Sequence, residues 1–188
     1  MKILIVDNYD SFTYNLVQLV RAITGNRPDV KRNDAIVLDA VAAYDKILLS
    51  PGPGIPAEAG NLNTLIETYA PTKSILGVCL GHQAIGQVFG AQLRNLDQVY
   101  HGLATPVRQL QQDVLFTGIG TQFEAGRYHS WVVDKAGFPE SLAITAEDEQ
   151  GYVMALRHKT YDVSGIQFHP ESILTPQGKQ MMINWLYH

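Results

Sequence analysis

Apolar residues follow two patterns along this chain. Short uninterrupted apolar runs are typical of strands buried on both faces, and apolar residues spaced by three or four are typical of helices with one buried side. In the first half the two patterns alternate. The predicted strands are Lys2–Val6, Asp29–Arg32, Lys46–Ser50 and Ser74–Val78, and the predicted helices are Phe12–Ile23, Leu38–Ala43, Leu62–Tyr69 and a helix from His82 to Phe89. This alternation predicts a parallel sheet with helices on both faces.

The second half shows helical spacing only at its end. Six strands with turn residues between them are predicted at Gln92–Arg94, Thr105–Gln109, Arg127–His129, Leu142–Ala146, Val153–His158 and Ser164–Phe168. They predict an antiparallel or mixed extension of the same sheet, closed by a helix over Pro176–Tyr187. The predicted fold class is therefore α/β, with an open, mostly parallel sheet flanked by helices.

Composition narrows the class of protein. A chain of 188 residues with 46% hydrophobic and 17% charged residues fits one well-buried domain over residues 1–188. The net charge is −4 with no basic stripe, so we expect no nucleic-acid partner. No apolar run is long enough to span a membrane. The single cysteine excludes an internal disulfide and favours a reducing cytoplasm. No pair of histidines has metal-ligand spacing, and we expect no metal and no cofactor.

That cysteine, Cys79, lies in a G-x-C-x-G frame between Gly77 and Gly81. Because a predicted strand precedes it and a predicted helix follows, Cys79 must lie on a tight turn, where glycines avoid steric clashes. We expect the turn to push the sulfur into solvent and to direct the helix N-terminus at it, which favours the thiolate. A lone cysteine is more often a small buried apolar residue, but the flanking glycines favour a nucleophile.

A cysteine nucleophile needs a base, and the best candidate is His169. It follows an apolar strand, and Glu171 is close enough in the sequence to turn back and orient the imidazole. The simpler interpretation is a histidine at a strand end beside a surface glutamate. Five other histidines compete for the role: His82, His101, His129, His158 and His188.

Three segments follow predicted parallel strands: Asp7–Ser11, Pro51–Gly54 and Cys79–Gly81. Because the carboxyl ends of parallel strands lie at one edge of a sheet, we expect these segments to form one pocket. The backbone N–H of Leu80 and one from the Pro51–Gly54 turn would stabilise an oxyanion. Gln83, one helical turn after the cysteine, is placed to hold a polar substrate. A stiff structural turn and a solvated helix position are the simpler alternatives.

Three motifs together resemble the class I, triad-type glutamine amidotransferases: SPGPGIP at 50–56, GVCLGHQ at 77–83 and QFHPE at 167–171. The resemblance implies a flavodoxin-like fold, with Cys79, His169 and Glu171 as the catalytic triad. It implies oxyanion N–H groups from Gly54 and Leu80. It also implies a binding site for L-glutamine made by Gly52, Pro53, Gly54, Gln83, Ser130 and Trp131.

Two further segments, Asp7–Asn15 and Arg127–Ser130, resemble the amidotransferase subunits of anthranilate synthase and aminodeoxychorismate synthase. Trp131 departs from that pattern, in which leucine is common. The resemblance implies that ammonia passes to a separate chorismate-binding synthase subunit, and it leaves both products open. We expect that partner to dock at Asn8, Tyr9, Asp10 and Ser11. Ordinary capping of the following helix is the simpler interpretation of the same residues.

Two other functions fit the same residues. One is a Cys-His hydrolase that acts on another γ-glutamyl compound or on a peptide. The other is a non-catalytic regulatory module that retains the fold, which the intact nucleophile, base and orienting carboxylate disfavour.

Overall fold

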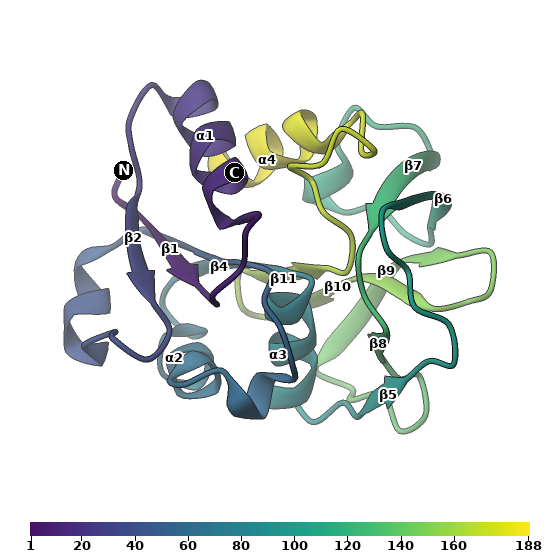
Figure 1. Cartoon of the computed structure of the whole chain (residues 1–188), viewed down its shortest axis with the longest axis horizontal. Helices are drawn as coiled ribbons and strands as arrows, with labels where there is room; N and C mark the ends of the chain where they lie inside the picture. Colours follow the sequence, from purple (N-terminus) through teal and green to yellow (C-terminus); the bar gives the residue numbers. More distant parts are fainter.

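The computed structural model describes all 188 residues, and one nine-stranded sheet runs through the molecule (Figure 1). The strand order is β2-β1-β3-β4-β11-β10-β9-β6-β7. The first five strands in that order are parallel: β2 Asp29–Arg32, β1 Ile3–Asp7, β3 Lys46–Leu49, β4 Ser74–Val78 and β11 Val163–Ile166. The other four are antiparallel: β10 Val153–His158, β9 Leu142–Asp148, β6 Leu103–Gln109 and β7 Gln122–Arg127. The predicted α/β fold with a mixed extension is confirmed.

Helices cover both faces of the sheet. Figure 1 shows α1 (Thr13–Thr24) and α4 (Gly178–Leu186) on one side, and α2 (Leu62–Tyr69) and α3 (Leu80–Val88) on the other. Each face has its own apolar core, of 23 and 22 buried residues. The two cores are nearly equal in size, so the central strands are buried on both faces and appear as continuous apolar runs in the sequence. No helix combines the length and apolar character needed to cross a bilayer.

Short elements complete the chain. Three 3-10 helices span Leu38–Ala43 (η1), Pro56–Glu58 (η2) and Val114–Phe116 (η3). The helix α1 ends at Gly25, which adopts φ 74°, the left-handed conformation that glycine supplies at helix ends. The last helix packs beside α1 on the same face of the sheet.

In the second half, one predicted strand is wrong, and another is present but lies outside the main sheet. Residues 128–130 do not continue a strand but connect β7 to β8 (Trp131–Val133), because the carbonyls of His129 and Ser130 accept hydrogen bonds from loop amides at Tyr100 and Leu96. The strand predicted at Gln92–Arg94 is β5 (Leu93–Asn95), which pairs only with β8 in a separate ribbon.

The last strand, β11, lies in the parallel part of the sheet, between β4 and β10. Its residue Ile166 pairs with Val78, the residue before Cys79. This register brings the segment that follows β11 to the carboxyl edge of the sheet, beside the turn after β4.

Candidate active site

Cys79 occupies a strained turn between β4 and α3. Its φ of 53° and ψ of −100° lie outside the regions that non-glycine residues ordinarily adopt. A Cβ atom on Gly77 would lie 2.4 Å from the carbonyl carbon of Gly81, and one on Gly81 would lie 2.7 Å from the carbonyl oxygen of Leu49. Both positions therefore require glycine, as the G-x-C-x-G frame predicts. The helix α3 begins at Leu80, so its first N–H groups surround the nucleophile position.

A cavity of about 270 Å³ lies above this turn. Cys79 lines it, together with all of the predicted glutamine-binding residues: Gly52, Pro53, Gly54, Gln83, Ser130 and Trp131. The expectation that the sulfur would lie in open solvent is wrong, because Cys79 is only 6% exposed. The segments 52–54, 99–101 and 128–131 enclose the same cavity, so a small substrate reaches the sulfur through that space.

His169 and Glu171 form a buried pair. His169 Nδ1 lies 2.7 Å from Glu171 Oε1, and the two side chains are 2% and 0% exposed. The other ring nitrogen, Nε2, is buried without a well-formed hydrogen bond, so it is the nitrogen left to interact with the Cys79 thiol. Burial lowers the pKa of His169, but interactions with Cys79 and Glu171 outweigh burial and raise this pKa to about 10. The imidazole is therefore protonated at neutral pH and can donate a proton.

Side chains that the sequence patterns did not single out hold His169 in place. The ring centroids of Phe12 and Tyr128 lie 5.2 and 4.7 Å from the imidazole centroid. The Thr175 hydroxyl donates to the His169 carbonyl at 2.7 Å and accepts from the Gly126 N–H at 2.9 Å. No local sequence motif predicts these contacts, because they join segments that are distant in the sequence.

The glycine-rich turn after β3 lies against the cysteine turn. A Cβ atom on Gly52 would lie 2.6 Å from the Asn8 Cβ and 2.7 Å from the Leu80 Cδ2, so glycine permits the close approach of these loops. Gly54 adopts φ 70°. Gly54 lines the cavity, and Leu80, which directly follows Cys79, contacts the same glycine-rich turn through its side chain.

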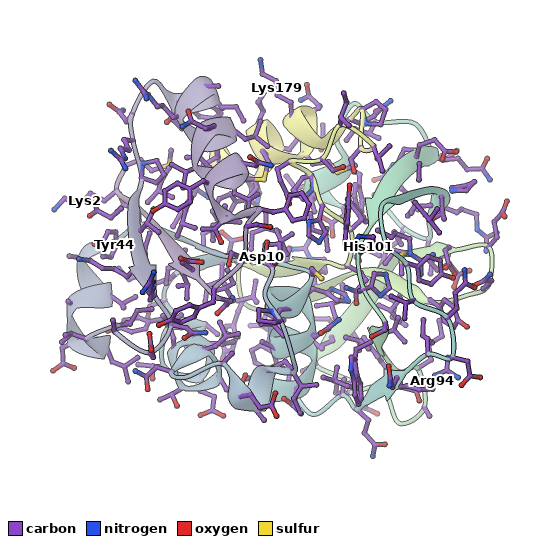
Figure 2. The ribbon with its side chains drawn as sticks, viewed as in Figure 1. Lys2, Asp10, Tyr44, Arg94, His101 and Lys179 are labelled. Atoms are coloured by element: carbon purple, nitrogen blue, oxygen red, sulfur yellow. The ribbon has the colours of Figure 1, made fainter.

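The segment Asp7–Ser11 supports the cavity from outside and does not line it. Asn8 is 2% exposed, and its side-chain amide donates to the Ser50 carbonyl at 2.8 Å. The prediction that Asn8 contacts a partner is therefore wrong, because its side chain is committed to holding two loops together. The next residue, Tyr9, is 49% exposed. Figure 2 labels Asp10, in the loop between β1 and α1, and His101, in the loop between β5 and β6, near the middle of the view.

The helix α1 is not capped by Ser11 or Thr13. Asp10 accepts from the Phe12 N–H at 2.7 Å, and Asp7 accepts from the Tyr9 N–H and from the Thr13 hydroxyl, at 3.0 and 2.9 Å. The two carboxylates thus organise the loop that leads into the helix.

Gln83 is already engaged within the protein. Its Nε2 donates to the Trp131 carbonyl at 2.9 Å and to Gln167 Oε1 at 3.1 Å. Both amide hydrogens are therefore used, and only the Gln83 carbonyl oxygen remains to accept a hydrogen bond from a substrate.

Comparisons with known proteins agree with this geometry. An anthranilate synthase component 2 from Thermus thermophilus is 47% identical over 99% of this chain and 92% of its own length. An aminodeoxychorismate synthase component 2 from Escherichia coli is 44% identical over 98% of this chain and 99% of its own. The crystal structure of a putative GMP synthase subunit from Thermoplasma acidophilum superposes with a TM-score of 0.87 at 25% identity, covering 100% of this chain and 92% of that one.

The match favours glutamine hydrolysis over the two alternative functions left open by the sequence. The family description that matches is "Glutamine amidotransferase class-I", over residues 4–188. With a cysteine turn and a glycine-rich loop at one cavity, and a buried His-Glu pair after the adjacent strand β11, this chain belongs to the class I glutamine amidotransferases.

Proposed function

We propose that Cys79, His169 and Glu171 hydrolyse L-glutamine in the 270 Å³ cavity. The Cys79 thiolate attacks the side-chain amide carbon, and the N–H groups of Gly54 and Leu80 stabilise the oxyanion that forms. Protonated His169 gives its proton to the departing nitrogen, so that ammonia leaves and a γ-glutamyl thioester remains. His169 then takes a proton from water as the water oxygen attacks the thioester carbon. The C–S bond breaks, which releases glutamate and regenerates the Cys79 thiolate.

One observation carries this proposal. The buried His169 has its Nδ1 occupied by Glu171 and its Nε2 unpartnered, and its raised pKa depends on Cys79. A structural histidine buried to this degree would instead stay neutral. A paired acid and nucleophile at a strained turn match the needs of acyl transfer.

The ammonia is consumed by a second protein in this proposal. Relatives of this chain are named component 2 of anthranilate synthase or of aminodeoxychorismate synthase, names that imply a component 1. We propose that this chain passes ammonia directly to a separate chorismate-using synthase subunit, for either product. Direct transfer matters because ammonia in water near neutral pH is mostly protonated and no longer nucleophilic. The cysteine must stay reduced to act, so we place the reaction in the cytoplasm.

Exposed residues near the catalytic loops are the proposed docking surface for that subunit. Tyr9 is 49% exposed, with Asp10 and Ser11 beside it in the sequence. Ile173 is 94% exposed and lies two residues after Glu171. A fully exposed isoleucine this close to the site is well placed to be covered by the protein that receives the ammonia.

Glutaminase assays on matched variants test the catalytic proposal. Cys79→Ser and His169→Gln should each lower the rate of glutamate release by at least about 100-fold. His158→Gln, at the end of the neighbouring strand β10 and outside the cavity, should keep the wild-type rate. Diazo-oxo-norleucine, a glutamine-like electrophile, should label the wild type at Cys79. An unlabelled Cys79, or an active Cys79→Ser variant, would refute the proposal.

The docking proposal has its own test. Each candidate synthase subunit is co-purified with the chain, and the product made from chorismate and glutamine is identified. Ile173→Asp and Tyr9→Ala should weaken the complex, whereas Val37→Asp, which changes a residue 69% exposed before η1, should not. Equal affinity of all three variants for the synthase would contradict the proposed surface.

A further inference from the structure

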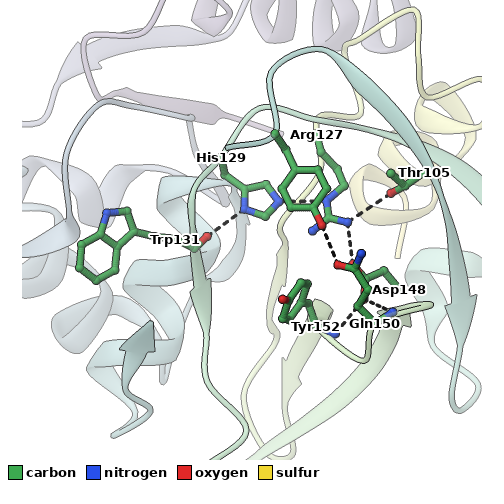
Figure 3. Close-up of polar contacts among 8 residues, drawn as sticks. Thr105, Arg127, His129, Trp131, Asp148, Gln150 and Tyr152 are labelled. Atoms are coloured by element: carbon green, nitrogen blue, oxygen red, sulfur yellow. Dashed lines mark hydrogen bonds and ion pairs between the residues drawn. The ribbon is translucent and has the colours of Figure 1, made fainter. Parts of the chain in front are cut away.

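A buried ion pair lies next to the cavity wall and takes no part in the proposed chemistry. Arg127 Nη1 lies 2.6 Å from Asp148 Oδ2, and the side chains are 1% and 3% exposed (Figure 3). The guanidinium carbon stands 3.5 Å from the ring centroid of Tyr100. Because burying a charged pair has a large desolvation cost, we expect this arginine to hold a further group in place.

That group is His129, two residues further along the chain. The Arg127 Nε–H donates to His129 Nε2 at 3.1 Å, and the Tyr100 ring stacks on the imidazole with centroids 5.3 Å apart. A guanidinium has only donors, so His129 Nε2 must be the unprotonated nitrogen. Nδ1 therefore carries the hydrogen of the neutral ring. Burial, and then the charge of Arg127, lower the pKa of His129 to about 3, so the ring remains neutral.

The proton on Nδ1 determines what the next residues can do. His129 Nδ1 lies 2.9 Å from the Trp131 carbonyl, which can only accept, so Nδ1–H donates to it (Figure 3). Gln83 Nε2 donates to the same carbonyl at 2.9 Å. Two donors use both lone pairs of the Trp131 carbonyl and so fix the peptide plane between Trp131 and Val132. This peptide ends the segment 129–131, which lines the cavity.

We propose that Arg127 and His129 are positioning residues for glutamine: Arg127 sets the tautomer of His129, and His129 holds the backbone of Ser130 and Trp131 in the orientation that receives the substrate. This inference rests on the proposed glutamine-binding role of that segment. The opposite tautomer would place two acceptors, Nδ1 and the Trp131 carbonyl, against each other and turn the peptide away. In this proposal Arg127 and His129 orient the substrate, whereas His169 and Glu171 take part in the reaction.

Two substitutions of the same histidine give a matched test. His129→Asn keeps an amide donor near the position of Nδ1, whereas His129→Gln places its amide near Nε2 and leaves the Trp131 carbonyl without that donor. His129→Gln should raise the KM for glutamine by about tenfold and leave kcat within about threefold of wild type, since loss of a buried hydrogen bond acts here on binding. His129→Asn should restore most of the KM.

Two electrophiles separate this inference from the proposed function. In His129→Gln, labelling of Cys79 by diazo-oxo-norleucine should need a correspondingly higher reagent concentration, while labelling by iodoacetamide, which has no amino-acid end, should keep the wild-type rate. A wild-type protein that does not hydrolyse glutamine would refute the proposed function itself. An active wild type with an unchanged KM in His129→Gln, or an equal KM in the Asn and Gln variants, would overturn only the positioning role.

Nitrogen-15 NMR of the histidine rings tests the tautomer without activity. His129 should show a protonated Nδ1 and an unprotonated Nε2 in the wild type, and Arg127→Lys, which keeps the charge beside Asp148 but lacks the Nε donor, should give a mixture of tautomers. Arg108→Gln, which breaks the exposed ion pair between Arg108 and Glu147, is the control that should change nothing. A protonated Nε2 in the wild type would overturn the inference even if the His129 variants failed to fold.

Discussion

Mild acid should destabilise this protein, because two buried histidines are neutral in the folded state. His82 is 0% exposed, and burial lowers its pKa to about 4. Burial and the nearby Arg127 charge lower the pKa of His129 to about 3. In the unfolded chain both rings have a pKa of about 6.5, so below that pH the unfolded state binds protons that the folded state refuses. Stability is therefore lost as the pH falls from about 6.5 towards these folded-state values.

The size of the effect follows from these values. Between pH 7 and pH 5 each of the two rings should cost about 2 kcal/mol of unfolding free energy. His169, whose pKa is raised to about 10, acts in the opposite direction. Because His169 is already protonated in the folded state at pH 7, it adds only about 1 kcal/mol to the unfolding free energy between pH 7 and pH 5. The net expected loss is about 3 kcal/mol.

Urea unfolding at the two pH values measures this loss, after coincident transitions by two spectroscopic probes establish two-state behaviour. His129→Asn removes one titrating ring and should reduce the pH dependence by about 2 kcal/mol. His188→Asn, at the exposed C-terminal residue, is the control and should leave the pH dependence unchanged. A loss below about 1 kcal/mol, or an unaltered dependence in His129→Asn, would refute the assignment of neutral buried rings.

Three further outcomes are expected. Gly77→Ala should abolish glutaminase activity and lower the unfolding free energy by about 1–3 kcal/mol, because its Cβ would lie 2.4 Å from the Gly81 backbone. Gly120→Ala is the control: the atom nearest its Cβ lies at 3.4 Å, so it should match the wild type in glutaminase activity and in unfolding free energy. Glu171→Gln should lower the rate of glutamate release by about 10²–10⁴ and move the NMR titration of His169 to lower pH. An unmoved titration would show that Glu171 is not one of the groups that raise the pKa of His169. Tyr128→Ala should lower the unfolding free energy by about 1 kcal/mol, measured by thermal unfolding, and should lose activity, because the ring no longer packs on His169. Tyr128→Phe removes only the hydroxyl contact with Ser172 and should keep most of the activity. Equal behaviour of the two variants would mean that the ring does not hold the imidazole.

Elements with a strong local pattern could be predicted from the sequence. The helix Leu62–Tyr69 and the strands Ser74–Val78 and Val153–His158 have the predicted bounds, because apolar spacing and turn residues define them locally. The cysteine turn could also be predicted, because Gly77 is required by its contact with Gly81 inside the same G-x-C-x-G frame.

Features that depend on distant segments could not be predicted. The segment 128–130 has strand-forming residues but turns out of the sheet, because its hydrogen-bond partners come from residues 96–100. The partner of Arg127 lies 21 residues away on β9, and no spacing rule connects them. Asn8 has the exposed-loop composition of a docking residue, yet its contacts with Ser50 and Asn33 bury it. In each case a tertiary contact overrides the local preference.

The backbone that holds the strained cysteine also sets the distance between nucleophile and base. A non-glycine residue at φ 53° costs about 1–3 kcal/mol and persists only where its surroundings determine it. Here the Cys79 N–H donates to the Ile166 carbonyl of β11 at 2.9 Å, and the Cys79 carbonyl accepts from the Gln83 N–H at 3.0 Å. Because β11 leads within three residues to His169, the hydrogen bond that stabilises the strained turn also fixes the base beside it. The strain is thus sustained by the same strand pairing that assembles the site, so the turn and the base cannot be displaced independently.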